Sequence, residues 1–171
     1  MSTGMTRKQY ISIMEWIRNK PYGISIIKWS GKGITYLTAF VYFAAGIFLL
    51  WQRDHRVIPL VMTPAVSFFL VSVFRARYGA IRPYEKYGFT PLIPKDTHGK
   101  SFPSRHVFSI FVIATVICYI WFLPGMILLL LGVVLAVLRV IMGVHFPKDV
   151  LAGAVVGVIS GCIGMGVWLL L

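Results

Sequence analysis

The feature that most constrains the fold is a stretch of uncharged residues, 107–138, the longest in the chain. As one α-helix this stretch would be about 48 Å long at about 1.5 Å per residue, whereas a bilayer crossing needs only about 20 residues. Pro124 and Gly125 lie near its middle, and such a pair is typical of a turn. The stretch therefore predicts two membrane-spanning helices joined by a tight hairpin.

The rest of the chain supplies more uncharged stretches of spanning length. Of the 171 residues 58% are hydrophobic and 13% are charged, which is more apolar surface than a soluble domain of this size can cover. We therefore predict an all-α fold in a single domain, 1–171, which is a polytopic membrane helix bundle of about five transmembrane helices. The predicted spans are 34–51, 57–74, 104–122, 126–142 and 150–171.

The N-terminal segment, 1–32, lacks the continuous apolar core of a signal peptide, so we do not expect it to be cleaved. Tyr10, Met14 and Ile17 recur at helical spacing among charged residues. This pattern predicts an amphipathic helix that lies on the membrane surface. The transmembrane bundle then occupies 33–171.

The chain is strongly basic, with 17 lysines and arginines against five acidic residues and a net charge of +12. A balance of this kind is common in nucleic-acid-binding proteins, but here the cations flank membrane segments. We therefore expect membrane lipids and a lipid phosphate substrate as partners, and no nucleic acid. Cys118 and Cys162 both fall inside predicted spans, so we expect no disulfide framework.

A polar corner, 139–149, separates the last two predicted spans. It carries Arg139, His145 and Asp149, and charges left at the end of a hydrophobic segment are usually functional. In this spacing they would supply a fixed cation, a nucleophile or base, and a partner that orients the imidazole. These are the parts of a phosphate-handling site.

The long polar loop, 75–103, adds to this site. Arg75 and Arg82 are seven residues apart, so a helix would place both on one face. Because two crossings separate this loop from the polar corner, both should emerge on the same side of the membrane. The start of the next span adds backbone N–H groups that favour an anion. The candidate site residues are Arg75, Arg82, Ser104, Arg105, His106, Arg139, His145 and Asp149.

These residues fall into three groups. The first is Arg75 with Arg82-Pro83, the second is Pro103-Ser104-Arg105-His106, and the third is Arg139 with His145 and Asp149. In this order they resemble the three signature motifs of the type 2 phosphatidic acid phosphatase superfamily. That family includes lipid phosphatases, undecaprenyl pyrophosphate phosphatases and soluble vanadium haloperoxidases. The likeness runs from residue 75 to the C-terminus.

The resemblance implies a role for each residue. His145 would attack phosphorus to form a phosphohistidine, Asp149 would orient it, and His106 would protonate the leaving group. No metal and no cofactor would be required. The phosphoryl oxygens would be held by Arg75, Arg82, Ser104 and Arg139, with Arg105 as a further contact to the phosphate or the headgroup.

The sequence departs from the family pattern at several places. Arg75 stands where lysine is usual, Arg105 where glycine is commonest, and Leu138 where a serine often precedes the third motif. The family commonly has six spans, and here the surface helix would replace the first.

Two other classes of protein fit the same residues. One is a non-catalytic lipid-phosphate binding or transport protein, whose histidines would be dispensable. The other is a metal-dependent hydrolase built from His106, His145 and Asp149, whose activity chelation would remove. Outside the motifs we expect solvent or headgroup contacts for Arg77, Lys86, Lys95, His98 and Lys100.

Gly153, Gly157 and Gly161 recur at four-residue intervals in the last span. This spacing allows close helix contact, either inside the bundle or between protomers of a homo-oligomer.

The membrane orientation is predicted from two opposed arguments. All lysines and arginines except Arg53 and Arg56 fall on the side of the candidate site, which by the positive-inside rule would be cytoplasmic. The family resemblance implies the outer face. Because substrate binding explains several of these cations, we predict a cell-membrane protein with its site on the outer face.

Overall fold

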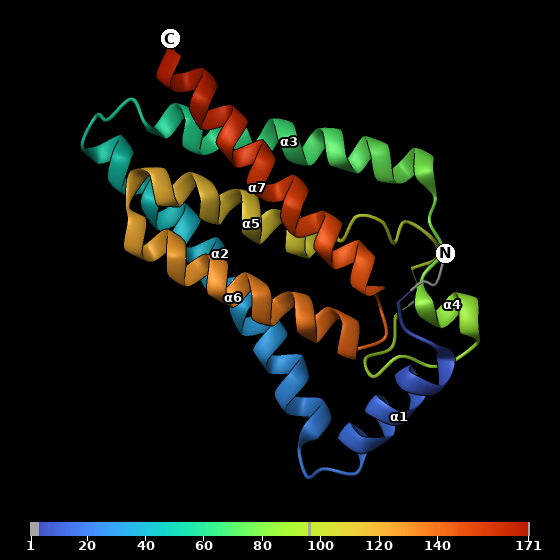
Figure 1. Ribbon diagram of the computed structural model, residues 1–171. Coiled ribbons are helices and arrows are strands. Elements are labelled where there is room, and N and C mark those ends of the chain that lie inside the picture. The colour runs from blue at the N-terminus through green and yellow to red at the C-terminus, as the bar shows by residue number, and fades with distance from the viewer. Residues whose placement is uncertain (1–3, 96, 171) are drawn as a thin grey trace.

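The computed structural model describes residues 4–95 and 97–170, and within them the only regular elements are helices (Figure 1). The predicted all-α fold is confirmed. The helices are α1 (Arg7–Arg18), α2 (Gly23–Trp51), α3 (Val57–Tyr78), α4 (Pro83–Tyr87), α5 (Arg105–Ile120), α6 (Phe122–Ile141) and α7 (Pro147–Leu170).

Four segments in the described part of the chain are long and apolar enough to cross a membrane, namely those of α2, α3, α6 and α7. The remaining predicted span corresponds to α5, an apolar helix of only 16 residues. It contacts α2, α3, α6 and α7 and lies among them in Figure 1. Most of its apolar side chains are therefore buried by other helices rather than by lipid.

The hairpin between α5 and α6 lies earlier than the sequence predicts. The extended residue is Trp121, and Pro124 belongs to the first turn of α6. Proline is tolerated there because the first N–H groups of a helix have no partner within the helix. The prediction of a break at Pro124 was therefore wrong by a few residues.

The predicted N-terminal helix exists as α1, and Thr6 and Gln9 form a capping box at its start. Its buried side chains pack with Leu92 and Phe146 of the same chain, so its apolar face is covered by protein and not by lipid. The first spanning helix also starts earlier than expected, because α2 begins at Gly23.

The glycines of α7 lie against α5. A side-chain carbon at Gly153 would stand 2.7 Å from the carbonyl oxygen of Ser104, and one at Gly157 would stand 2.8 Å from that of Phe108. Gly161 faces Thr115 in the same way. The close contact is thus made inside the bundle, and this face is not available to a second copy of the chain.

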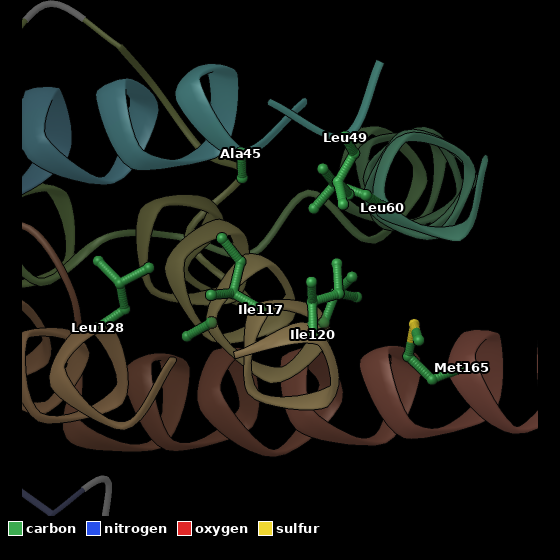
Figure 2. Packing of buried hydrophobic residues seen from close by; sticks show 9 residues of the cluster. Ala45, Leu49, Leu60, Ile117, Ile120, Leu128 and Met165 are labelled. Atoms are coloured by element: carbon green, nitrogen blue, oxygen red, sulfur yellow. The ribbon is translucent and has the colours of Figure 1, made fainter. Parts of the chain in front are cut away.

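A hydrophobic cluster closes one end of the bundle (Figure 2). Leu49 of α2 and Leu60 of α3 are fully buried and point toward each other, with Ile117 of α5 below them. Because lipid is as apolar as the interior of the bundle, such side chains stabilise helix association in a membrane through close van der Waals packing. This packing fixes the helices at the end opposite to the one where the candidate site residues gather.

Candidate active site

The three motif segments meet at one end of the bundle. Arg75 lies in the last turn of α3, Arg82 precedes α4, and Arg139 lies in the last turn of α6. Two hydrogen bonds join the first two motif segments to the polar corner. The backbone N–H of Ser104 donates to the carbonyl oxygen of Asp149 at 2.8 Å, and the guanidinium group of Arg82 donates to the carbonyl oxygen of Val144 at 3.2 Å. The structure thus places both segments on one side of the bundle, as expected from the crossings between them.

His145 lies just before α7 and is only 2% exposed. Its Nδ1 atom is 3.4 Å from the hydroxyl oxygen of Ser101 and 3.7 Å from the Oδ2 atom of Asp149. No hydrogen bond from the described residues engages Nε2. One nitrogen is therefore held by protein while the other is left for a ligand.

Asp149 is held in place by two donors. Its Oδ2 atom accepts from the Ser101 hydroxyl at 2.5 Å and from the Phe146 N–H at 3.0 Å. The carboxylate also lies in the first turn of α7, where the helix dipole favours negative charge. Ser101 was missed as a site residue by sequence reasoning, and its only signal was its place two residues before the second motif.

The protonation state of His145 follows from its surroundings. Burial lowers the pKa of His145 to about 4, while the neighbouring Asp149 acts in the opposite direction. The imidazole is therefore neutral at physiological pH, which is the form that a nucleophile requires.

Arg75, Arg82 and Arg139 form a guanidinium cage around the site. Arg75 donates to the carbonyl oxygens of Lys100 and Ser101, and Arg82 donates to that of Gly99 at 3.0 Å. The Nε atom of Arg139 is buried and has no hydrogen-bond partner among the described residues. No carboxylate of the described chain forms an ion pair with these three groups, so their charge remains for an anion.

A cavity of about 300 Å³ lies beside this cage. His106 and Arg139 line it together with Val144, the neighbour of His145, and with Lys95. Burial, followed by the effect of four nearby arginines, lowers the pKa of Lys95 to about 8. Lys95 thus lines this cavity, where the sequence predicted contact with solvent or headgroups.

Ser104 and Arg105 have different surroundings although they are adjacent. Ser104 is fully buried, and its hydroxyl oxygen has no hydrogen-bond partner among the described residues. Arg105 is exposed and lies 5.5 Å from the ring of Phe68. It lines an apolar groove of about 660 Å³ between α2 and α3, which His106 also borders. Arg105 thus borders the groove and also acts electrostatically on Arg75 of the guanidinium cage.

The fold and this grouping of charges define a multi-pass membrane protein with a cluster of cations at one end. The family model of the PAP2 superfamily matches residues 56–169, which contain all three motifs. The chain belongs to the PAP2 superfamily, whose members among its relatives include membrane lipid phosphatases.

Two proteins of known sequence are similar to this chain over most of their length. YbjG of Escherichia coli (strain K12), named provisionally as an undecaprenyl-diphosphatase, is 30% identical over 145 residues, which are 84% of this chain and 72% of YbjG. BcrC of Bacillus licheniformis, named a bacitracin transport permease protein, is 28% identical over 144 residues, which are 76% of this chain and 71% of BcrC.

Two solved structures share the fold. Aquifex aeolicus LpxE superimposes with a TM-score of 0.72 at 28% identity and covers 93% of each chain. A PAP2-type phosphatidylglycerolphosphate phosphatase from Bacillus subtilis gives a TM-score of 0.72 at 20% identity, over 94% of this chain and 85% of that one.

Proposed function

We propose that this protein removes a phosphate from a lipid phosphate or lipid diphosphate through a covalent phosphohistidine on His145, without a metal. The observation that carries the proposal is the arrangement around His145. Its Nδ1 atom faces Ser101 and Asp149, and the guanidinium cage lies beside it with unpaired charge. A nucleophile, its orienting partner and fixed cations are what phosphoryl transfer needs.

The proposed reaction has two steps. In the first, Nε2 of His145 attacks phosphorus, a P–N bond forms, the P–O bond to the lipid breaks, and His106 gives its proton to the leaving oxygen. In the second, His106 takes a proton from water, whose oxygen attacks phosphorus. The P–N bond then breaks, and inorganic phosphate and neutral His145 are released.

The guanidinium cage and Ser104 would hold the three oxygens of the transferring group. Their charges and donors are already in place, so they can follow the phosphoryl group into the transition state without rearrangement. The Ser104 hydroxyl and the Nε atom of Arg139 can each donate to a phosphoryl oxygen, because neither has a hydrogen-bond partner among the described residues.

The lipid part of the substrate would lie in the apolar groove between α2 and α3. His106 borders both this groove and the polar cavity, so a headgroup in the cavity and a tail in the groove would meet beside it. The names of the relatives point to undecaprenyl diphosphate and phosphatidylglycerol phosphate as candidates. Phosphatidic acid and a lipid A phosphate carry the same reacting group and belong in the same substrate panel.

Replacing His145 tests the proposal. Purified His145→Ala protein should release no phosphate from any of these lipids while keeping the helical content and melting temperature of the parent. His55→Ala is a matched control, because His55 is exposed in the turn between α2 and α3, at the other end of the bundle. Near-normal phosphate release by the His145→Ala protein would remove the assignment.

One observation favours keeping a second candidate function, which is lipid-phosphate binding or transport. BcrC carries a transport permease name, although that name describes BcrC. For a transporter, alanine at His106 and His145 would leave function intact while alanine at Arg75 or Arg82 would not. A metal-dependent hydrolase would lose activity on thorough chelation, whereas the proposed mechanism predicts full activity in excess chelator.

We further propose that the protein lies in the cell membrane with its site on the outer face. The positive-inside rule counts lysines and arginines near the ends of the spans. The cations of the guanidinium cage are explained by substrate binding, so they should be left out of that count. Helix α7 starts beside the site and crosses the bundle once, so a cysteine added at the C-terminus is expected on the side opposite to the site. Impermeant thiol reagents should label it only in broken cells, and labelling in intact cells would reverse the orientation.

A further inference from the structure

Three lysines border the cavity beside the guanidinium cage, and none belongs to the three motifs. Lys28 and Lys32 come from α2, and Lys95 comes from the loop between α4 and α5. The two lysines of α2 also lie outside the part of the chain that the PAP2 family model matches. All three share this cavity with His106.

Helix packing holds the two lysines of α2 at the cavity. Gly31 is buried against the end of α6, and a side-chain carbon there would stand 3.2 Å from the Cε atom of Met142. Lys28 and Lys32 are one helical turn apart on either side of this contact, so they lie on the same face. The approach of α2 to Met142 thus directs both side chains to the rim of the cavity.

The cavity holds far more positive than negative charge. No described carboxylate forms an ion pair with Lys28, Lys32 or Lys95, and the ammonium group of Lys32 lies over the ring of Trp29 at 5.2 Å. Arg75, Arg82, Arg105 and Arg139 all act electrostatically on Lys95. Like charges brought together in a partly buried space are unfavourable unless an anion joins them.

In the proposed function, the guanidinium cage already binds the oxygens of the one phosphoryl group that is transferred. The lysines line the cavity together with His106, the residue that would protonate the leaving oxygen, whereas Arg75 and Arg82 do not line it. Any charge that they bind is therefore on the leaving-group side of the bond that breaks. A lipid diphosphate has its second phosphate at that position, whereas a lipid monophosphate has only an uncharged alkoxy group there.

We propose that Lys28, Lys32 and Lys95 form a subsite for the second phosphate of a lipid diphosphate, and that this subsite makes the enzyme prefer diphosphates. The inference rests on the proposed function. The terminal phosphorus bonds to Nε2 of His145 while its bond to the bridging oxygen breaks, and that oxygen takes the proton of His106. The leaving group is a lipid monophosphate, whose charge the lysines stabilise as it develops.

Lysine-to-glutamine variants test the subsite. Lys95→Gln and the double variant Lys28→Gln with Lys32→Gln remove positive charge without adding negative charge. Lys8→Gln and the double variant Lys8→Gln with Lys20→Gln remove the same charge from exposed positions on and next to α1. Each protein is assayed in detergent micelles with farnesyl diphosphate, farnesyl monophosphate and phosphatidylglycerol phosphate.

The subsite predicts that each cavity variant lowers kcat/KM for the diphosphate about tenfold more than for the monophosphate. The exposed controls should leave the ratio of the two values within about twofold of the parent. Equal losses on both substrates, or no loss on either, would overturn the subsite. A cavity variant could also lower kcat/KM for phosphatidylglycerol phosphate as strongly as for the diphosphate. That result would overturn the assignment to a diphosphate, because a glycerol separates the two phosphates of this lipid.

A binding measurement separates failure of the subsite from failure of the proposed function. His145→Ala protein is titrated with inorganic pyrophosphate and with inorganic phosphate by calorimetry. The subsite predicts that pyrophosphate binds at least tenfold more tightly than phosphate, and that Lys95→Gln removes this difference. Equal binding of the two anions would overturn the subsite. If the parent enzyme releases no phosphate from any lipid while this binding preference holds, the proposed function fails and the subsite stands.

Discussion

The hydroxyl of Tyr10 donates a hydrogen bond of 3.1 Å to the backbone carbonyl oxygen of His145. Tyr10 is 1% exposed, and its ring packs against those of Phe89 and Phe146 at centroid distances of 5.6 and 6.3 Å. This contact ties α1 directly to the segment that carries the proposed nucleophile. The N-terminal helix, although outside the residues matched by the family model, is thus part of the framework of the site.

Replacing Tyr10 by phenylalanine should slow the reaction more than it weakens substrate binding. The ring packing stays, but the His145 carbonyl loses its donor, and a net loss of about 1 kcal/mol in the free energy of unfolding is expected. We expect kcat to fall about threefold to tenfold with KM within about twofold of the parent. Tyr22→Phe is the control, since Tyr22 is 81% exposed. Parent-like kcat in the Tyr10→Phe protein would show that this hydrogen bond does not position His145.

Ser101 is the second positioning residue that we predict. Its hydroxyl lies between Asp149 and Nδ1 of His145, so Ser101→Ala removes one of the two donors to the carboxylate. We expect kcat to fall about tenfold, which corresponds to about 1.4 kcal/mol of transition-state stabilisation. Ser101→Thr keeps the hydroxyl and should restore part of the rate if the extra methyl group fits. An unchanged kcat for Ser101→Ala would contradict the role.

Much of this architecture was predictable from the sequence. Long uncharged stretches fix the number and order of the apolar helices, because few other structures bury so many consecutive apolar residues. The number of crossings then determines which polar segments share an end. This reasoning placed five of the candidate site residues at one end of the bundle, and the structure has them there: Arg75, Arg82, His106, Arg139 and His145.

The features that the sequence did not reveal depend on tertiary contacts. The acceptor of the Tyr10 hydroxyl is a backbone carbonyl, and a backbone acceptor leaves no mark in the sequence. The helical period of α1 shows that one face is apolar but cannot say whether lipid or protein covers it. Arg105 belongs to a motif but points to the groove between α2 and α3, because consecutive helix positions face different directions.

The pH dependence should reflect the burial of His145. Because the pKa of His145 lies at about 4 instead of 6.5, the acidic limb of kcat/KM is expected near pH 4. His106 must also carry a proton, and it shares a cavity with Arg139 and Lys95, so it is expected to be protonated only when a bound phosphate offsets their charge. The rate should therefore fall again on the basic side in kcat, which reports the enzyme–substrate complex, and give a bell-shaped profile there. His145 also affects stability. Between pH 4 and 6.5 this histidine is protonated in the unfolded chain but not in the folded chain, so the free energy of unfolding should decrease as pH falls from about 6.5 to about 4.

Asp149→Asn gives the matched comparison for this profile. Asp149 raises the pKa of His145 against the larger effect of burial, so the amide should move the acidic limb to lower pH. The plateau rate should also fall, because the imidazole loses the partner that orients it. An acidic limb that stays near pH 6.5 in the parent enzyme would contradict the buried, neutral nucleophile.

The covalent intermediate tests the central claim most directly. Enzyme mixed with lipid substrate labelled in its terminal phosphate is quenched within milliseconds in alkaline detergent, which preserves phosphohistidine, and is digested for mass spectrometry. The account predicts a phosphoryl group on the peptide that contains His145, lost in the His145→Ala protein and in enzyme quenched after substrate is exhausted. Full turnover with no phosphoryl group on that peptide at any quench time, or the same label in the His145→Ala protein, would contradict it.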